Sequence, residues 1–518
     1  MPQASPPVLA PGGISSDTQS TSHTVFDGAP ITVSPVSTSF PPSNPPGRNL
    51  ILCFDGTGDQ FDSDNSNIVQ FFSILRKGDK DKQLVYYQAG IGTYTTPQIA
   101  TPLFSKISKA FDEAVAWNLD AHVMGGYEFL MQNYTTGDRI CIFGFSRGAY
   151  TARSLAGMIH KVGLLPVCNH QQVPFAYKMY TRDDPVGWAQ SSAFKQAFSI
   201  DVDIEFMGVW DTVSSVGLIA RSLPFTTSNT IVHTFRHAIS LDERRVKFKP
   251  NFWQGNPVEE HVAEKPKPGT TPHVRPHPNK IHSTDHEVMH LELERKHSKH
   301  VKEQTDVKEV WFAGCHCDVG GGSVKNEVKV NLARIPLRWM IRECYKARSG
   351  IIFESKGLLD IGLDPKSLSQ SAVHKPRPPA LSGVGSIILS IPPRVKSMPA
   401  PVENDPEPTP FFTESSKLRR SEEQLDLEDA LSPIYDMLAV KPPWWILEVL
   451  PIRVRYPHFR KFEWNFGKGR NVPTTGKGKV LVHRSVRTRM EALHVDGSQY
   501  KPRAAGVDWE GGEIEWVD

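Results

Sequence analysis

The segment that most restricts how this chain can fold is residues 139–153, which read RICIFGFSRGAYTAR. It begins with an apolar run that is typical of a strand buried on both faces, and it continues into the spacing of an amphipathic helix. Between the two lies a GxSxG pattern. Its glycines, Gly144 and Gly148, lack the Cβ atoms that would collide with the strand and the helix around Ser146. The segment therefore predicts a nucleophile elbow; an ordinary tight turn with a bystander serine is the alternative.

Composition favours one large globular domain with irregular attachments. The chain has 518 residues, and 39% of them are apolar, which is enough for a substantial core. Its 42 prolines gather in the first 47 residues, near 255–280 and near 376–410, a distribution typical of tails and loops. The formal net charge of +3 gives no reason to expect a nucleic-acid partner.

The sequence carries no signal for export or for membrane insertion. Its amino terminus lacks the basic start and apolar core of a signal peptide, and no apolar run of about 18 residues predicts a transmembrane segment. The six cysteines show no spacing typical of a disulfide framework, so a reducing compartment is favoured. We therefore expect a cytoplasmic protein, with peripheral contact to membranes left open.

Strands alternate with helices in the first two thirds of the chain. The sequence predicts strands at 49–54, 83–88, 140–143, 203–210 and 308–313, and helices at about 111–134, after Ser146, and at 336–347. This alternation predicts an α/β fold with a mainly parallel sheet and helices on both faces. The expected domains are a disordered Pro/Ser/Thr-rich tail at 1–48, a catalytic domain at 49–350 with a His/Pro-rich insertion at 255–305, a largely disordered insertion at 351–430, and a carboxyl-terminal segment at 431–518 that packs on or caps the catalytic domain.

Predicted strands end next to residues that a hydrolase uses. Ser146, Asp211 and His316 each follow such a strand, in the chain order found in α/β-hydrolases. Ligands in parallel α/β sheets bind at the carboxyl ends of the strands. We therefore predict that Ser146 attacks an acyl carbonyl, that His316 takes its proton, and that Asp211 orients the imidazole.

The oxyanion hole is assigned to backbone amides, one from Arg147 and the other from the loop of Gly56 and Thr57 that follows the first strand. With an oxyanion hole of amides and a histidine base, this mechanism needs no metal and no cofactor. A chain of this kind is expected to act on a carboxylic ester.

Each triad role has rival candidates. His237 is the main rival base, and His160, near a predicted helix end, is a weaker one. Asp203 and Asp318 are alternatives to Asp211, which could instead be a helix N-cap.

Other catalytic patterns fit the sequence less well. The loop after Phe54 is similar to a phosphatase DxDGT motif, but the position of the nucleophilic aspartate holds Cys53. No GxxxxGK[ST] loop and no Rossmann pattern occurs. Seven histidines between positions 273 and 300 match no closed metal site, and packing is favoured over ligation for Cys315 and Cys317.

An apolar patch near the carboxyl terminus has two interpretations. It comprises Trp444, Trp445, Ile446, Leu447, Val449 and Leu450, with cationic residues on both sides. Paired tryptophans with nearby cations can anchor at a bilayer surface. A core helix, or a cap over the active site, is the favoured alternative.

Five blocks of the chain resemble a known family. They are residues 52–59, 144–153, 209–213, 237–245 and 311–322. Together they resemble the uncharacterised α/β-hydrolase domain family whose bacterial members include type VI secretion phospholipase effectors. Residues 444–451 and 483–490 are similar, more loosely, to its eukaryotic, fungal branch.

The resemblance implies a Ser-Asp-His esterase acting on phospholipid acyl esters, with Ser146, Asp211 and His316 in the matching positions. Where the family often has Asn after the first loop, this chain has Asp59, and nearby asparagines at positions 65 and 67 are candidates to supply an amide. The expected function is a lipase or phospholipase-type serine esterase. A catalytically silent hydrolase fold that binds partners through its Pro-rich segments is the alternative.

Overall fold

The computed structural model describes residues 47–57, 59–90, 104–213, 223–254, 292–297, 304–369, 371–375, 377, 388–389, 421–448, 452–456, 459–463, 465–473, 479–494, 497–509 and 511–518. For residues 104–118, 388–389, 452–456 and 459–463 it describes the backbone alone. Most of the 255–305 insertion, with six of the seven histidines between positions 273 and 300, lies outside the described residues, as does most of the tail at 1–48.

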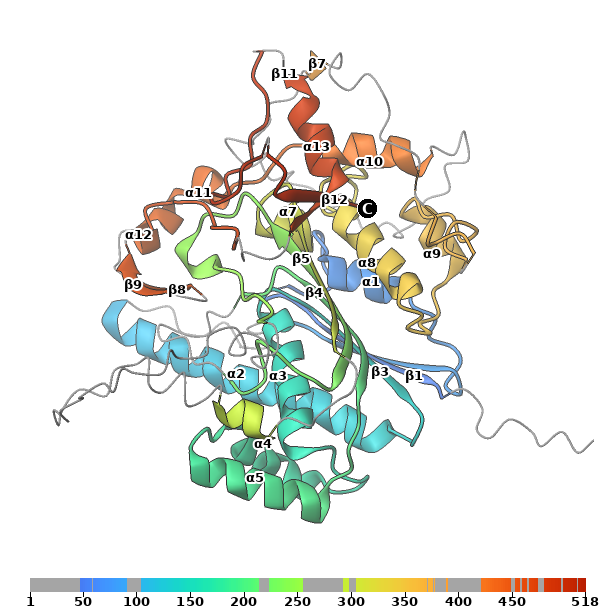
Figure 1. Ribbon diagram of the computed structural model, residues 1–518, viewed down its shortest axis with the longest axis vertical. Helices are drawn as coiled ribbons and strands as arrows, with labels where there is room; N and C mark the ends of the chain where they lie inside the picture. Colours follow the sequence, from blue (N-terminus) through green and yellow to red (C-terminus); the bar gives the residue numbers. More distant parts are fainter. Residues whose placement is uncertain are drawn as a thin grey trace, which may run out of the picture. The chain divides into compact units, whose positions relative to one another are not determined.

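One eight-stranded sheet forms the centre of the described structure, in the order β12-β10-β6-β5-β4-β3-β1-β2 (Figure 1). Each strand pair in it is parallel. The strands are β1 (Asn49–Phe54), β2 (Gln83–Gln88), β3 (Arg139–Phe145), β4 (Ile204–Trp210), β5 (Val232–Ser240), β6 (Asp306–Phe312), β10 (Val480–His483) and β12 (Ile514–Val517). The predicted α/β class with a parallel sheet is therefore confirmed.

The central strands are apolar on both faces because both faces are covered. In β1, Leu50 and Leu52 join one hydrophobic cluster, and Ile51 and Cys53 join another on the opposite face. Successive side chains of a strand point to opposite faces of the sheet, so an unbroken apolar run places apolar side chains in the hydrophobic core on both faces.

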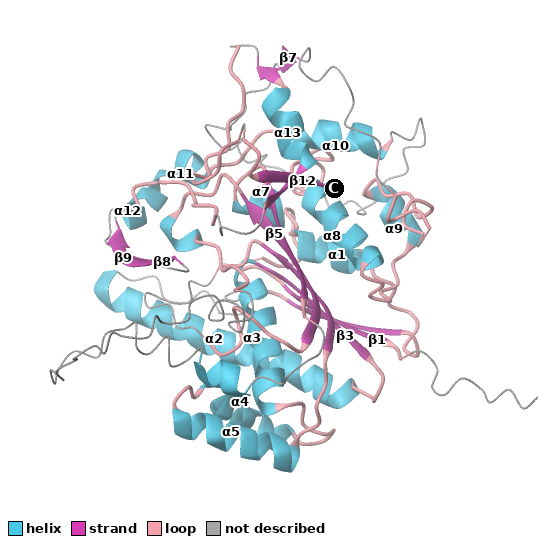
Figure 2. Cartoon of the chain, in the orientation of Figure 1, coloured by secondary structure: helices cyan, strands magenta, loops and turns pink. Residues whose placement is uncertain are grey.

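Helices lie on both faces of the sheet (Figure 2). One face packs against α2 (Phe104–Asn133), α3 (Ser146–Val162), α4 (Val173–Thr181) and α5 (Pro185–Phe198), and the other against α1 (Asn67–Ser73), α8 (Arg334–Lys346) and α9 (Ser355–Asp360). The shorter elements are α7 (His316–Gly320), α10 (Glu422–Ala430), α11 (Met437–Val440), α12 (Trp445–Glu448), α13 (Arg484–Glu491), β7 (Ile388–Leu389), β8 (Ile452–Tyr456), β9 (Phe459–Glu463) and β11 (Leu493–His494).

Three strands of the sheet were not predicted. Strand β5 carries two polar side chains that interrupt its apolar pattern, Arg236 and His237, and both are buried in ion pairs or hydrogen bonds. Strands β10 and β12 come from the carboxyl-terminal segment and extend the sheet beyond β6. The expectation that this segment packs on or caps the catalytic domain did not include these strands.

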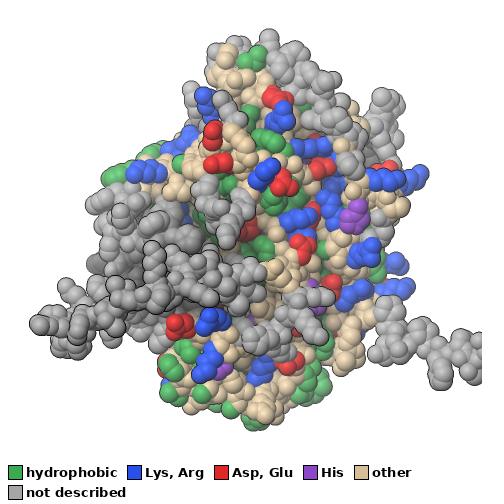
Figure 3. All heavy atoms as spheres, viewed as in Figure 1, with side chains coloured by type: hydrophobic (Ala, Val, Ile, Leu, Met, Phe, Trp, Pro, Cys, Tyr) green, Lys and Arg blue, Asp and Glu red, His purple; other side chains and the backbone are tan. Residues whose placement is uncertain are grey.

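Hydrophobic side chains are exposed among polar and charged ones on the surface over α4 and α5 (Figure 3). Phe175, Val186 and Phe198 are about half exposed there. No helix within the described ranges is long and apolar enough to cross a membrane.

Close packing between α3 and β1 makes a prediction about stability. A Cβ atom on Gly148 would lie 2.3 Å from the backbone oxygen of Asp55 and 2.4 Å from that of Phe54. Gly148→Ala should therefore lower the free energy of unfolding by about 2 kcal/mol, although alanine favours helices. Gly78→Ala, where nothing lies within 4 Å of the added atom, is the control. Urea unfolding curves that coincide for the two variants would contradict this account.

Candidate active site

Ser146 stands on a strained turn between β3 and α3. Its φ of 57° lies in the left-handed region that residues with a side chain rarely adopt. A Cβ atom on Gly144 would lie 2.5 Å from the backbone oxygen of Gly148, so the turn closes only with glycine at that position. The strained geometry of the predicted elbow is present, and the serine is 5% exposed.

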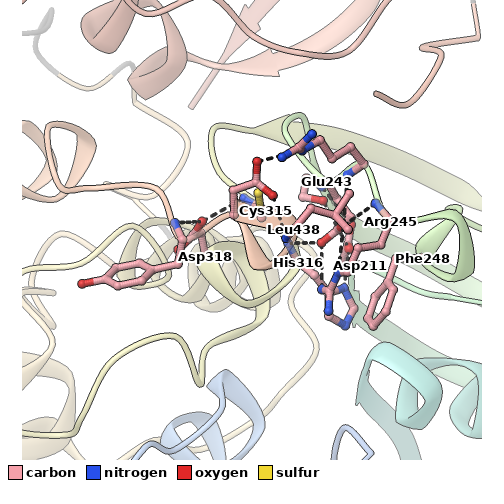
Figure 4. A network of polar contacts seen from close by, with 12 residues as sticks. Asp211, Glu243, Arg245, Phe248, Cys315, His316, Asp318 and Leu438 are labelled. Carbon is pink, nitrogen blue, oxygen red and sulfur yellow. Dashed lines mark hydrogen bonds and ion pairs between the residues drawn. The ribbon is translucent and has the colours of Figure 1, made fainter. Parts of the chain in front are cut away.

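Asp211 and His316 are joined by a hydrogen bond at the same edge of the sheet. Asp211 follows β4, and His316 begins α7 after β6. The Nδ1 atom of His316 lies 2.6 Å from Oδ2 of Asp211 (Figure 4). Burial alone would raise the pKa of Asp211, but the Arg470 guanidinium and the His316 ring hold it well below its usual range. The carboxyl group is therefore ionised at neutral pH.

The imidazole of His316 is held between two aromatic rings. The Phe145 ring stacks on it at a centroid distance of 4.7 Å, and the Phe248 ring meets it edge-on at 4.7 Å. Since Phe145 immediately precedes Ser146, this stacking places the imidazole next to the elbow. Because Nδ1 is occupied by Asp211, Nε2 is the nitrogen left for proton exchange. Burial lowers the pKa of His316, against the opposing effect of Asp211.

A second ion pair supports the backbone of this histidine. Oε2 of Glu243 lies 3.3 Å from the backbone nitrogen of His316 and 2.9 Å from an Nη of Arg245 (Figure 4). Burial would raise the pKa of Glu243, but Arg245 lowers it to about 2. The Arg245 guanidinium also covers the Phe248 ring, 3.5 Å from its centroid.

One of the two backbone amides considered in the loop after β1 has a partner within the fold. The backbone N–H of Gly56 donates to the Asp55 carboxylate at 2.8 Å, so it is already engaged. The hydroxyl of Thr57 is buried without a hydrogen-bond partner within the described part of the chain. Of the two predicted residues of this loop, Thr57 is therefore the better placed to donate to a ligand.

Asp59 lies against the same loop. A Cβ atom on Gly56 would lie 2.1 Å from its Oδ2 and 2.8 Å from the Phe145 ring. Burial, with nearby carboxylates, raises the pKa of Asp59 to about 8, while Arg147 lowers it. The amide of Asn67 donates to two backbone carbonyls, so this side chain supports the fold locally. Asn65 accepts the backbone N–H of Asp62 through Oδ1, and its Nδ2 is buried without a hydrogen-bond partner within the described residues.

The rival residues have other partners in the structure. The ring of His237 contacts Glu309 at 2.8 Å through Nδ1 and accepts the Thr212 N–H at 3.1 Å through Nε2. His160 lies fourteen residues beyond Ser146 on α3, roughly 20 Å along the helix axis.

Neither rival carboxylate is the one bonded to His316. Asp203 precedes β4, at the opposite end of that strand from Asp211, and its side chain is 57% exposed. Asp318 accepts the backbone N–H groups of Cys315 and Tyr435. Asp211 is therefore the carboxylate at the histidine.

The predicted packing role of the two cysteines beside His316 has partial support. Cys315 is buried in a hydrophobic cluster, and its Sγ lies 3.4 Å from the backbone oxygen of Asp242. The described residues contain no group of three or more His, Cys, Asp or Glu side chains placed to hold a metal ion.

The sequence analysis missed Arg470. Both of its Nη atoms contact the Asp211 carboxylate, at 2.5 and 2.9 Å, and the side chain is 1% exposed. Arg470 lies in a glycine- and lysine-rich stretch, FGKGRN, that reads as a solvent-exposed loop. No local pattern distinguishes this arginine from its exposed neighbours.

The apolar patch lies next to the site. Trp444 meets the Phe248 ring edge-on at 5.7 Å, and Phe248 contacts His316. Trp445 and Ile446 are exposed by 38% and 56%. Val449 and Leu450, which complete the predicted patch, lie outside the described residues.

Comparisons with known proteins found several similar chains. An uncharacterized protein of Saccharomyces cerevisiae, YEL023C, is 27% identical over 565 residues, covering 86% of this chain and 79% of the yeast protein. Among solved structures, an uncharacterized protein from Pseudomonas aeruginosa is similar at 16% identity and a TM-score of 0.33, covering 63% of this chain and 50% of that one. The Tle1 effector bound to the VgrG spike of the type VI secretion system is similar at 17% identity and a TM-score of 0.25, covering 54% and 52%.

This chain thus spans about half the length of each of those two structures. The model of the catalytic domain of the Tle1-like type VI secretion phospholipase effectors matches residues 48–343. That range is more than half of the chain and contains the strained serine together with the Asp211–His316 pair. The protein therefore belongs to the Tle1-like family of phospholipase-type hydrolase domains.

Proposed function

We propose that this protein is a serine carboxyl-ester hydrolase that acts on lipid acyl esters. Ser146 is the nucleophile, His316 the general base, and Asp211 the residue that orients the imidazole and stabilises its protonated form. The observation that supports this most directly is the 2.6 Å hydrogen bond between Asp211 and His316, with the imidazole stacked on the residue that precedes the strained serine.

The reaction would follow the usual course of acyl transfer. As the Ser146 hydroxyl attacks the ester carbonyl, its proton passes to Nε2 of His316, which later protonates the leaving alcohol. Water then cleaves the acyl-serine ester with the same histidine as base. The backbone N–H of Arg147 and the loop at Thr57 are the proposed donors to the oxyanion.

A lipid substrate is supported by the family and by the surface beside the site. The family model that matches this chain describes the catalytic domain of phospholipase effectors. In this chain, the exposed side chains of Trp445 and Ile446 lie beside Trp444, which contacts the site through Phe248. Such a surface can dock on a lipid boundary that presents the ester. Peripheral membrane contact is part of this proposal, and a cytoplasmic location stays a prediction.

Covalent labelling tests whether Ser146 is activated. A fluorophosphonate probe should label the protein, and Ser146→Ala should abolish labelling and lower esterase activity by about 10⁴-fold or more, since only an activated serine reacts. Ser154→Ala is the control, because Ser154 is a buried serine on the same helix whose hydroxyl donates to the Tyr150 backbone oxygen. A folded wild-type protein that neither labels nor hydrolyses esters would favour the catalytically silent module.

The pH profile tests the base and the oxyanion loop together. His316 must be neutral to accept a proton, and its pKa lies below the usual value of about 6.5, so kcat/KM should rise through an acid limb below that pH. Asp59 ionises near pH 8 and would then place a negative charge beside the oxyanion, so activity should fall above that pH. In Asp59→Asn the acid limb should stay and the alkaline fall should disappear. An unchanged alkaline limb would remove Asp59 from this role.

The apolar patch predicts a dependence on substrate form. Each apolar side chain buried at a lipid boundary contributes roughly 1.5–3 kcal/mol. Replacing Trp444 and Trp445 with Ser should therefore reduce hydrolysis of phospholipid vesicles far more than hydrolysis of a short soluble ester. The matched control replaces Phe175 and Phe198 with Ser, since these phenylalanines are comparably exposed on α4 and α5. Equal losses on both substrates in the tryptophan variant would show that the patch only supports the fold.

A further inference from the structure

The Asp211 carboxylate has more hydrogen-bond donors than a triad aspartate needs for the histidine alone. Its Oδ1 accepts from the Ser240 backbone N–H at 2.9 Å and from Arg470 at 2.5 Å. Its Oδ2 accepts from His316 at 2.6 Å, from Arg470 at 2.9 Å and from the Ser240 hydroxyl at 3.3 Å. Arg470 contacts both oxygens in the two-pronged geometry that suits guanidinium and carboxylate groups.

Arg470 is held in this position by its own surroundings. Its Nη1 also donates to the Ser240 hydroxyl at 2.7 Å, and its Nη2 to the Phe248 backbone oxygen at 2.5 Å. Its backbone oxygen accepts the Ala505 N–H at 2.8 Å, and Val472 bonds back to Ala505 at 2.9 Å. The guanidinium therefore joins β5, the Phe248 loop that contacts the imidazole, and the carboxyl-terminal segment at the triad carboxylate.

A guanidinium in this place has two physical effects on the pair of Asp211 and His316. Asp211 is fully buried, and an ion pair offsets the free energy that its charge loses on leaving water. The contacts to both oxygens fix the carboxylate plane, so that Oδ2 faces the imidazole. The permanent positive charge also opposes protonation of His316, which keeps the base neutral at lower pH.

We infer that Arg470 is a positioning residue of the active site, and that the catalytic unit therefore includes the carboxyl-terminal segment around 465–473, beyond the residues 48–343 that match the family. This inference rests on the proposed function. The segment is 259 residues away from Asp211 in the sequence, and the tertiary structure alone brings the two together.

Variants of Arg470 give a direct test. In Arg470→Ala, kcat/KM on a soluble ester should fall by about 10²-fold, because the carboxylate is no longer fixed. Added guanidinium ion should restore part of that activity. Added ammonium should restore less, since it cannot donate two parallel hydrogen bonds to the two carboxylate oxygens. The acid limb of the pH profile should move to higher pH, because the pair of Asp211 and His316 has lost a neighbouring positive charge.

Arg489→Ala is the matched control. Arg489 is equally buried in the same carboxyl-terminal segment, but its Nη1 bonds to the backbone oxygens of Ala430 and Ser432. This variant should lose stability without a change in the acid limb. If Arg470→Ala fails to fold, Arg470→Lys is the second variant, because it keeps the positive charge but cannot form hydrogen bonds to both carboxylate oxygens. It should show a reduced kcat/KM with a smaller shift of the acid limb.

An Arg470 variant that folds and keeps both the wild-type kcat/KM and the wild-type acid limb would overturn the inference. An NMR titration of the His316 ring separates this outcome from failure of the proposed function. The pKa of His316 should rise in Arg470→Gln even if no ester is hydrolysed by the wild type, whereas an unchanged titration would overturn the role of Arg470 alone.

Discussion

The site depends on two strained turns that lie side by side at the carboxyl edge of the sheet. Ser146 and Asp211 both have positive φ values, 57° and 41°. Ser146 follows Phe145 and Asp211 follows Trp210, and these two preceding residues are paired between β3 and β4. Strain of this kind costs of order 1–3 kcal/mol per residue and persists only where the surroundings enforce it. Here the parallel ladder fixes the two strand ends, and the Val213 N–H donates to the Ser146 backbone oxygen at 3.4 Å.

Buried ion pairs join the carboxyl-terminal segment to the parallel sheet domain. Arg338 of α8 bonds to Asp426 at 2.7 Å and to Asp429 at 2.6 Å on α10, and Arg470 forms a similar buried pair with the Asp211 carboxylate. A buried pair is costly to break, because the remaining charge is left without a partner in a poorly hydrated site. The carboxyl-terminal segment is therefore tied to the sheet by specific charges as well as by the hydrophobic cluster beneath β10 and β12.

The imidazole connects this charged interior to an exposed apolar surface. One edge of the His316 ring meets Asp211, one face meets Phe145, and the Phe248 ring lies between it and Trp444. Ser146 and His316 are both nearly inaccessible to solvent. Phe248 contacts this imidazole directly, and Trp444 is linked to it through Phe248.

Local sequence determined the parts of this protein that depend on short-range sterics and periodicity. The apolar runs at β1, β3, β4 and β6, the glycines around Ser146, and the strand ends that carry Asp211 and His316 were all predictable, because strand burial and tight turns restrict residue type locally. Strand β5 was not, since its buried Arg236 and His237 find their partners, Glu343 and Glu309, far along the chain. Only the tertiary structure decided which histidine and which arginine contact Asp211. The reason is that the attraction between two charges becomes strong and specific only where folding has removed the water around them.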